Sequence, residues 1–267
     1  MGFAENVYSD VMRIREAKPL VLNVTNYVVA NTTANALLAL GASPAMSHNP
    51  EDLEDLTVFA GALVVNIGTP SSEFLEGVEM AGKVALGHSI PVVLDPVAAG
   101  ATSIRTKTAL RFIKEYKPSV VRGNASEIMA ISGAKGRPKG VDSSQKANEG
   151  VGAAVDLAKL FSCVVCISGE QDYVTDGERT MVLSGGHAMM PLVTGLGCTA
   201  SSLIGAFLSV NLDPFLATAH AMAIMSTAGR MAADRAEGPG TLQLHFYDML
   251  YTCTAEDVER QIRAEML

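Results

Sequence analysis

The chain has 267 residues, of which 48% are hydrophobic and none is tryptophan, and its formal net charge is −8. This length allows one large α/β domain or two small ones, with a core of aliphatic side chains. The negative charge argues against a nucleic-acid partner, which needs a basic surface. No uninterrupted apolar run is long enough for a transmembrane helix, so we expect no membrane partner.

The first half of the chain alternates between short apolar runs and segments of helical period. Residues 1–19 carry many charged side chains and predict an amphipathic helix, not a signal peptide. Asn49 is placed to cap a helix that opens with Pro50 and two acidic residues. Strands are expected at residues 20–24, 43–46, 62–67, 91–94 and 119–122, and helices at 28–40, from 50, from 71 or 72 to about 86, at 102–116 and from 124 or 126 to about 133.

The second half begins with a polar stretch and ends in helices. Residues 134–146 are rich in Gly, Lys, Ser and Pro and predict a loop. The pair Asp176-Gly177 favours a hairpin turn between two short strands. The expected elements are a helix at 151–160, a strand at 163–168, hairpin strands at 173–175 and 180–183, and then mainly helices, including 198–210, a buried helix at 214–233 and a solvated one over 255–267.

This alternation predicts an α/β fold with a mostly parallel sheet that is covered by helices on both faces. No repeat or clear linker interrupts it, so residues 1–267 are expected to form a single domain. Cys163 and Cys166 have the spacing of a redox or zinc motif, but residues three apart in a strand point to opposite faces. We therefore expect both to be structural. Four cysteines without a targeting signal predict reduced thiols in the cytoplasm.

Polar residues gather where the expected parallel strands end. Ligands bind at the carboxyl ends of the strands in such sheets, so these residues predict a small-molecule site. Taken singly, each also has a structural explanation, such as capping a turn or pairing with a neighbour. The residues at this edge are Asn23, Thr25, Met46, His48, Asn66, Gly68, Asp95, Arg122 and Ser168.

Residues 193–202 contain Gly195 and Gly197, followed by Cys198 and a run of small residues. Glycine allows a positive φ and a close approach of a ligand to the backbone. The helix that follows directs its free amide groups at this turn. The turn is therefore a candidate binding site for a phosphate or for an anion that develops during a reaction. Cys198 lies where a group that accepts a proton from an alcohol is needed. The alternative is a plain glycine turn before a helix with a buried thiol.

The segment from Asn124 to Glu127 places a carboxylate in the first turn of a helix, close to Arg122. Mg²⁺ is usually held by one or two carboxylates together with substrate phosphates, which makes Glu127 and Asp95 candidate magnesium residues. Arg122 would neutralise phosphate oxygens in a forked contact. The alternative is that Glu127 is a capping-box acid that bonds back to Asn124.

Several blocks of the sequence carry a resemblance to a known family. The Asn-x-x-Glu segment, Asp95-Pro-Val and Gly195-Leu-Gly resemble the ribokinase-like superfamily, which implies a three-layer α/β/α sandwich. The order and spacing of all the blocks, from residue 23 to about 205, resemble hydroxyethylthiazole kinases. The blocks are Val24-Thr-Asn-Tyr, Ala45-Met-Ser-His, Asn66-Ile-Gly-Thr, Leu94-Asp-Pro-Val-Ala-Ala-Gly and Val121-Arg-Gly-Asn-Ala-Ser-Glu-Ile.

The resemblance implies transfer of a phosphoryl group from ATP, with Mg²⁺, to the hydroxyl of 5-(2-hydroxyethyl)-4-methylthiazole in thiamine salvage. It also implies a homotrimer with the thiazole pockets between subunits. Together with neighbours at the same turn and strand ends, the implied site residues are Cys198 and Gly197 for catalysis; Met46, Gly195, Asn23 and Gly68 for the substrate; Arg122, Ser168 and Thr194 for ATP; and Glu127, Asp95 and Asn124 for the metal.

Cys198 departs from the wider superfamily, in which many members have Asp as the base at this position. A thiol has a reference pKa of about 8.5, which falls at helix N-termini and near cations. Phosphoryl transfer depends mainly on positioning and charge stabilisation, so a poor base should slow the enzyme without abolishing its activity. Some thiazole kinases carry Cys here, which supports the narrower resemblance.

Two alternatives remain open at this stage. One is another kinase of the same fold that acts on a pyrimidine alcohol or a sugar, although Met46 and the scarcity of acids near Asn23 disfavour a sugar. The other is a non-catalytic binding protein that has lost its base. The presence of Glu127, Arg122 and both glycines argues against it.

Overall fold

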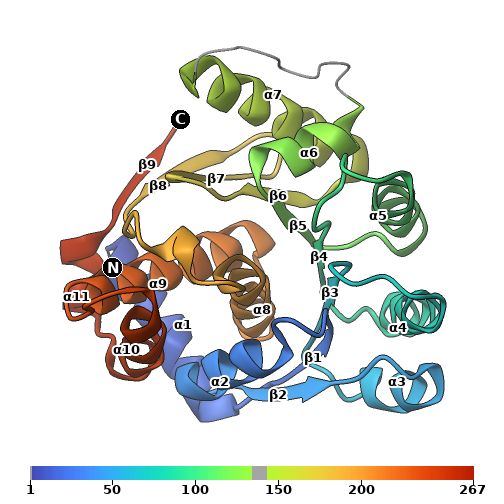
Figure 1. Ribbon diagram of the computed structural model, residues 1–267, viewed down its shortest axis with the longest axis horizontal. Coiled ribbons are helices and arrows are strands. Elements are labelled where there is room, and N and C mark those ends of the chain that lie inside the picture. Colours follow the sequence, from blue (N-terminus) through green and yellow to red (C-terminus); the bar gives the residue numbers. More distant parts are fainter. Residues whose placement is uncertain (1, 134–142) are drawn as a thin grey trace.

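The computed structural model describes residues 2–133 and 143–267, which form a nine-stranded sheet with helices on both faces (Figure 1). The strand order is β2-β1-β3-β4-β5-β6-β7-β8-β9. Strands β1 to β6 are parallel, and β7, β8 and β9 are added antiparallel. The strands are β1 (Leu20–Val24), β2 (Ser43–Met46), β3 (Ala62–Asn66), β4 (Val92–Asp95), β5 (Val120–Gly123), β6 (Val164–Ile167), β7 (Gln171–Thr175), β8 (Thr180–Ser184) and β9 (Arg263–Met266).

Helices alternate with the parallel strands as far as β6 and then follow one another near the C-terminus. A short 3-10 turn, η1 (Met190–Leu192), precedes α8. The helices are α1 (Phe3–Ala17), α2 (Ala30–Leu40), α3 (Pro50–Thr57), α4 (Ser72–His88), α5 (Ser103–Tyr116), α6 (Ala125–Ser132), α7 (Ser143–Phe161), α8 (Leu196–Leu208), α9 (Pro214–Ala233), α10 (Pro239–Thr252) and α11 (Ala255–Gln261).

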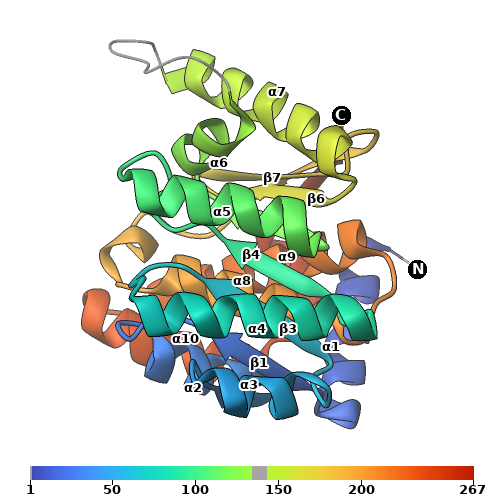
Figure 2. The same ribbon diagram turned by 90° about the vertical axis from the view of Figure 1, so that its right-hand side faces the viewer.

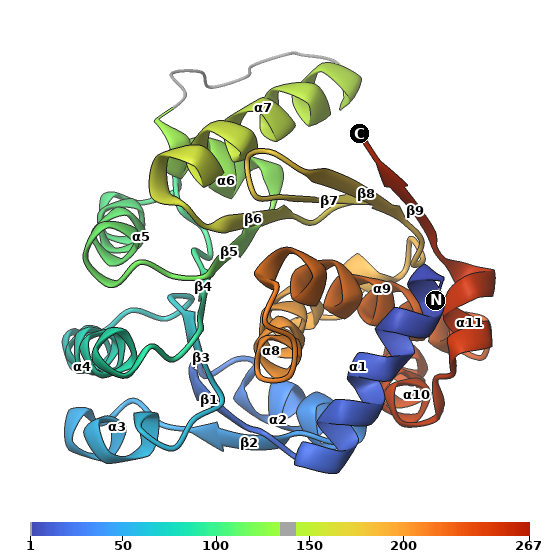
Figure 3. The same cartoon turned by 180° about the vertical axis from the view of Figure 1, so that it is seen from behind.

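The helices form two layers around the sheet, which confirms the expected α/β/α sandwich. Helices α3 to α7 cover one face in sequence order (Figure 2). On the other face α8 packs on β1, β3 and β4, and α9 packs on β6, β7 and β8. Helices α1, α2, α10 and α11 lie outside these two, and the sheet bends beyond β5 so that its antiparallel part closes over α9 (Figure 3).

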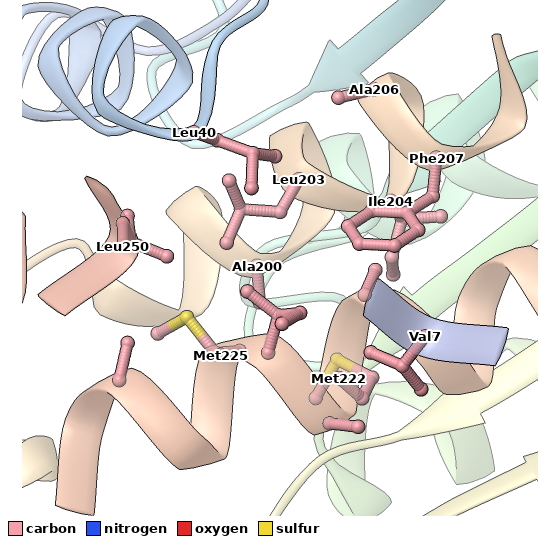
Figure 4. Packing of buried hydrophobic residues seen from close by; sticks show 14 of the residues in the cluster. Val7, Leu40, Ala200, Leu203, Ile204, Ala206, Phe207, Met222, Met225 and Leu250 are labelled. Atoms are coloured by element: carbon pink, nitrogen blue, oxygen red, sulfur yellow. The ribbon is translucent and has the colours of Figure 1, made fainter. Parts of the chain in front are cut away.

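Each face of the sheet has its own apolar core. On the α8–α9 side, Leu203, Phe207 and Met222 belong to a fully buried cluster (Figure 4). Cys166 lies in this cluster, whereas Cys163 lies in the core on the α3–α7 side. The prediction that the two thiols face opposite sides of a strand is confirmed, and both cysteines are free.

Local signals in the sequence account for most of the boundaries. Asn49 caps α3 by accepting bonds from the amides of Glu51 and Asp52. Gly41 ends α2 with a φ of 113°, which glycine adopts without strain. The antiparallel pairing of β7 with β8 confirms the expected hairpin, whose connection runs from Asp176 to Arg179.

Two expected boundaries differ from the structure. Most of the expected loop at 134–146 lies outside the described residues, but α7 already begins at Ser143, so the loop was predicted too long. The tail was predicted as a helix over 255–267, and this was wrong after residue 261. There β9 pairs with β8, an edge that only the folded sheet provides.

Helix α9 is almost completely buried, as its composition predicted. In its middle, His220 Nδ1 lies 2.6 Å from Asp10 Oδ2 of α1, which ties the N-terminal helix to the core. Asn211 Nδ2 donates to the same carboxylate at 2.7 Å. No helix in the described part of the chain is long and apolar enough to cross a membrane.

Candidate active site

Polar side chains at the ends of the parallel strands form a row that faces α8. The alternation of a strand produces it: in β4, Leu94 packs in the α3–α7 core and Asp95 points the other way. The Ser201 hydroxyl of α8 donates to Asp95 Oδ2 at 2.7 Å. The Ser202 hydroxyl donates to Asn23 Oδ1 at 2.6 Å. The row consists of Asn23 on β1, Asn66 on β3, Asp95 on β4 and Arg122 on β5.

The first turn of α8 lies directly above this row. Gly195 precedes the helix with a φ of 91°, and a Cβ there would lie 2.7 Å from Val29. A Cβ on Gly197 would lie 3.1 Å from Arg122 Nη1, so the guanidinium approaches the helix backbone closely. Gly195 offers no capping side chain, and the first turn of α8 carries no acidic residue. The free amides, the helix dipole and Arg122 therefore favour an anion at this point.

Asp95 is a buried carboxylate in the middle of the row. Its Oδ2 accepts hydrogen bonds from Ser201 and from Asn66 Nδ2 at 3.0 Å, and lies 3.6 Å from Arg122 Nη1. Burial raises the pKa of Asp95 to about 6, because the charge of Arg122 and the two hydrogen bonds offset only part of the loss of solvation. The site therefore holds a carboxylate whose loss of solvation is only partly compensated by its one positive neighbour, Arg122.

Arg122 connects this carboxylate to the antiparallel part of the sheet. Its Nη2 donates to the hydroxyl of Ser168, which follows β6. Its Nε has no hydrogen-bond partner within the described chain. Among the described residues, the carboxylate that pairs with Arg122 is Asp95, whereas pairing with the neighbouring Glu127 was the structural explanation that the sequence allowed.

Cys198 lies at the helix mouth and is half-buried. Asn26 Nδ2 lies 3.7 Å from its sulfur and also donates to Asn66 Oδ1 at 2.8 Å. Burial and, to a smaller extent, the negative charge of Asp95 raise the pKa of the Cys198 thiol to about 11. Helix N-termini and nearby cations lower the pKa of a thiol, but here burial outweighs the charge of Arg122. The thiol is neutral near pH 7.

Glu127 has the capping-box contacts that were considered as the alternative to metal binding. Its Oε2 accepts from the Asn124 amide at 2.8 Å, and Asn124 Oδ1 accepts from the Glu127 amide at 2.9 Å. Its Oε1 accepts from the amide of Ala98, in the loop after β4, also at 2.8 Å. The capping bonds orient the carboxylate next to the strand-end row.

These oxygens fit a Mg²⁺ ion that is bound largely through water and phosphate. Within residues 2–133 and 143–267 no three His, Cys, Asp or Glu side chains cluster closely enough to form a metal site by themselves. Mg²⁺ seldom uses such a protein cage, and one or two carboxylates beside substrate phosphates suffice. Glu127 and Asp95 provide carboxylates, and Asn124 provides a carboxamide oxygen.

A cavity of about 1590 Å³ opens beside the first turn of α8, toward β6, β7 and α9. It is lined by predicted ATP residues Arg122, Ser168 and Thr194 and by Gly195 and Gly197. Its volume exceeds that of a typical small-molecule pocket, so a nucleotide fits. The structure thus brings the predicted nucleotide residues together on one side of α8.

Of the four residues predicted for the acceptor, Gly195 lines this cavity, whereas Met46, Gly68 and Asn23 do not. Met46 is half-buried on the edge strand β2, where it pairs in register with Asn23. A Cβ on Gly68 would lie 2.7 Å from Asn26 Nδ2, so glycine is required for that contact. Asn23 is fully buried and bonds to Ser202 and to Val21 O. These bonds link β1 to α8, and the substrate contact expected from the sequence stays a prediction.

Three polar residues of the site were not singled out from the sequence. Asn26 lies inside the Thr-Asn-Tyr block but was not assigned a contact. Ser201 lies three residues after Cys198, on the helix face that meets the sheet. Asp172 is buried in β7, lines the cavity and accepts from the Gly169 amide at 3.1 Å. In the sequence Asp172 follows Glu170 and Gln171 in a polar run before the expected strand, so no local signal marks it as buried.

Comparison with known proteins gives the same assignment along nearly the whole chain. The hydroxyethylthiazole kinase family model matches residues 11–256. A hydroxyethylthiazole kinase from Oleidesulfovibrio alaskensis is 50% identical over 253 residues, which cover 95% of this chain and 95% of that protein.

Solved structures agree with the sequence comparison. The structure of a hydroxyethylthiazole kinase from Pyrococcus horikoshii OT3 has a TM-score of 0.91 at 37% identity, and the match covers 98% of this chain and 99% of that chain. A pyridoxal kinase from Staphylococcus aureus has a TM-score of 0.61 at 18% identity over 79% of this chain and 88% of its own, which is a likeness of fold alone. The fold is ribokinase-like, and the chain belongs to the hydroxyethylthiazole kinase family.

Proposed function

We propose that this protein uses ATP to phosphorylate the hydroxyl group of 5-(2-hydroxyethyl)-4-methylthiazole in thiamine salvage. Its family supports the reaction and the acceptor. The observation that carries the proposal is the first turn of α8, where free amides meet Arg122 beside a cavity of nucleotide size. Donors fixed in this way stabilise the charge of a transferring phosphoryl group without reorganising during the reaction.

On the nucleotide side we assign Arg122, Ser168 and Thr194 to ATP. Ser168 orients the guanidinium of Arg122, which lines the cavity and would face a phosphate oxygen there. The amide of Gly197 belongs to the anion hole, because the absence of a side chain lets the phosphoryl group approach the helix. The transition state of phosphoryl transfer is loose, so such positioning does most of the catalytic work.

On the acceptor side we place the reacting hydroxyl next to Cys198. Met46, Gly195 and Gly68 surround the thiazole ring, and Asn23 acts indirectly by fixing α8 through Ser202. A thiol with a pKa of about 11 is a poor proton acceptor at neutral pH. A loose transition state needs little help from a base, so we expect a modest rate, not an inactive protein.

Mg²⁺ is part of the proposal as the partner of ATP. Glu127, Asp95 and Asn124 would hold it, mostly through water, and when bound it would neutralise charge on the phosphates. The contribution of the chain is to keep the Glu127 carboxylate aimed at this place through the amides of Ala98 and Asn124.

The proposal also covers organisation and location. One sheet passes through the described residues, which favours a single domain over residues 1–267. A homotrimer with thiazole pockets between subunits fits the half-buried Met46 on an edge strand and the exposed Tyr27, whose ring contacts His48. Four free cysteines fit the reducing cytoplasm, where ATP is available.

A coupled assay with purified protein, ATP and Mg²⁺ tests the function. We expect ADP to form only when hydroxyethylthiazole is present, and phosphorus NMR to detect its phosphate ester. If kcat/KM is higher for a hydroxymethylpyrimidine or a sugar than for hydroxyethylthiazole, the proposed acceptor is wrong and that compound takes its place. Binding of thiazole or nucleotide in calorimetry without any ADP would show that the protein is a non-catalytic binder.

A further inference from the structure

Arg105, in the first turn of α5, joins two loops that border the active site. Its Nη1 donates to the carbonyl of Ile67 at 3.1 Å and to that of Val97 at 3.0 Å. Its Nη2 donates to the carbonyl of Gly68 at 2.8 Å. The loop after β3 and the loop after β4 are therefore held by one half-buried guanidinium.

The first clamped peptide supports the acceptor side. The Ile67 carbonyl and the Gly68 amide belong to the same peptide unit, so Arg105 holds one end of it. The Gly68 amide, at the other end, donates to Asn66 Oδ1 at 3.1 Å. The same oxygen accepts from Asn26, the residue whose amide nitrogen lies next to the sulfur of Cys198.

The second clamped peptide supports the side assigned to the metal. The Val97 carbonyl and the Ala98 amide form one peptide unit, and the amide donates to Glu127 Oε1 at 2.8 Å. Ala98 has a φ of 58°, in the left-handed region that is unfavourable for a residue with a Cβ. Such a conformation persists only when its surroundings fix it, and Arg105 and Glu127 fix this peptide from its two ends.

The position of Arg105 is not explained by the stability of its own helix. A positive side chain in the first turn opposes the helix dipole. On the same helix Arg111 lies in a mid-helix position that is favourable for a surface arginine, where it bonds to Glu115 at 3.0 Å and pairs with Glu79. Arg105 instead donates to backbone oxygens of two loops. A guanidinium is suited to such contacts because its N–H donors lie in one plane and point in fixed directions.

We infer that Arg105 is a positioning residue that orients both peptides and so couples the acceptor half of the site to the metal half. The inference rests on the proposed kinase function. Without the guanidinium, Asn66 and Glu127 lose the fixed amides that orient them, and the acceptor hydroxyl and the phosphates are no longer aligned together. Alignment errors of this kind cost about 100-fold in rate.

The test compares Arg105→Ala and Arg105→Lys with Arg111→Ala as the matched control. For Arg105→Ala we expect kcat/KM for hydroxyethylthiazole to fall about 100-fold, while the KM for ATP changes by less than about threefold. Arg105→Lys keeps the charge but not the fork, and should lose about tenfold. Guanidinium ions at millimolar concentration should restore about tenfold of the loss in Arg105→Ala, whereas urea should not.

Four outcomes overturn the inference. They are a kcat/KM for Arg105→Ala within about twofold of the unaltered protein, an equal loss in Arg111→Ala, a loss confined to the KM for ATP, and no rescue by guanidinium. If Arg105→Ala does not fold, Arg105→Lys decides, and full activity there also overturns the inference. Failure of the unaltered protein to phosphorylate the thiazole would instead remove the proposed function.

Discussion

Two fully buried carboxylates, Asp95 in the site and Asp10 in α1, have pKa values shifted in opposite directions. Burial raises the pKa of Asp95 to about 6. Burial acts in the same direction on Asp10, but hydrogen bonds from His220 and Asn211 and the nearby positive charges outweigh it, so the pKa of Asp10 is lowered.

The difference lies in the number and distance of the partners. Asp10 has His220 at 2.6 Å, Asn211 at 2.7 Å and Arg13 on its other oxygen. Asp95 has two neutral donors, and its cation, Arg122, lies at 3.6 Å and also bonds to Ser168. The pair at α1 is a compensated structural link, whereas the site keeps a carboxylate short of positive charge. Shifted carboxylates of this kind concentrate where ligands bring the missing charge.

The largest expected effect follows from removing the charge of Asp95. We expect Asp95→Asn to lower kcat/KM about 1000-fold, because the site loses a charge next to the transferring group. Its unfolding free energy should stay within about 1 kcal/mol or rise, since the neutral isostere no longer has to be buried as an ion. Steady-state kinetics and urea unfolding measure the two quantities. If Asp95→Asn is strongly destabilised but keeps a normal kcat, Asp95 has the structural role that we assign to Asp10.

The next effect is the reverse pattern at Asp10. We expect Asp10→Ala to lower the unfolding free energy by about 3 kcal/mol, because the partners in the buried pair are left uncompensated. The kcat of the folded fraction should be unchanged, since α1 contributes no residue to the site. Urea unfolding with activity measured at low temperature checks both. A loss of kcat as large as the one expected at Asp95 would make the α1 link part of the catalytic machinery.

The pH dependence of stability separates the two carboxylate types. The pKa of Asp95 and that of Asp172 are both raised to about 6 by burial, so their contribution to stability is complete below the ordinary value of 3.8 and is lost as the pH rises through 6. The contribution of Asp10, whose pKa is lowered, is present above 3.8 and is lost as the pH falls through its folded-state pKa. We therefore expect the unfolding free energy to be greater near pH 5 than near pH 7.5 by about 1–3 kcal/mol, and to fall in stronger acid.

Asp172→Asn provides the control for this profile. It should remove part of the gain between pH 7.5 and pH 5, because one of the two titrating carboxyls is absent. The acid limb should remain, since Asp10 is unchanged. An identical profile in the variant would mean that the general charge of the molecule, not these buried groups, sets the dependence.

The sequence was sufficient for what local chemistry decides. Strand spacing placed Asp95 and Arg122 at the same sheet edge, and Asn49 and Gly41 marked helix boundaries that the structure confirms. It was insufficient where distant segments meet. Strand β9 needs the edge of β8, so a seven-residue helix followed by a strand was predicted as one helix.

The candidate site divides in the same way. The residues at the strand ends were predictable, but their partners were not, because the bonds of Asp95 to Ser201 and of Asn23 to Ser202 depend on how α8 packs. The raised pKa of Cys198 also depends on this packing. A helix N-terminus is visible in a sequence, whereas the burial that outweighs it is a property of the assembled fold.

The smallest predicted effect is that of Cys198→Asp. It tests whether the incomplete charge compensation around Asp95 favours catalysis. In Cys198→Asp a third carboxyl enters this environment, where the same burial and the charge of Asp95 that raise the thiol pKa should raise its own pKa toward neutrality. A base with a pKa near the working pH is more effective, so we expect kcat to be held or raised by up to about tenfold. The added carboxyl should also lower the unfolding free energy at high pH, where it ionises.

Steady-state kinetics from pH 6 to pH 9 measures the change in kcat, with Cys198→Ser as the neutral control. Complete loss of activity in Cys198→Asp, with Cys198→Ser active, would mean that the thiol packs against the thiazole and that the acceptor half tolerates no further charge.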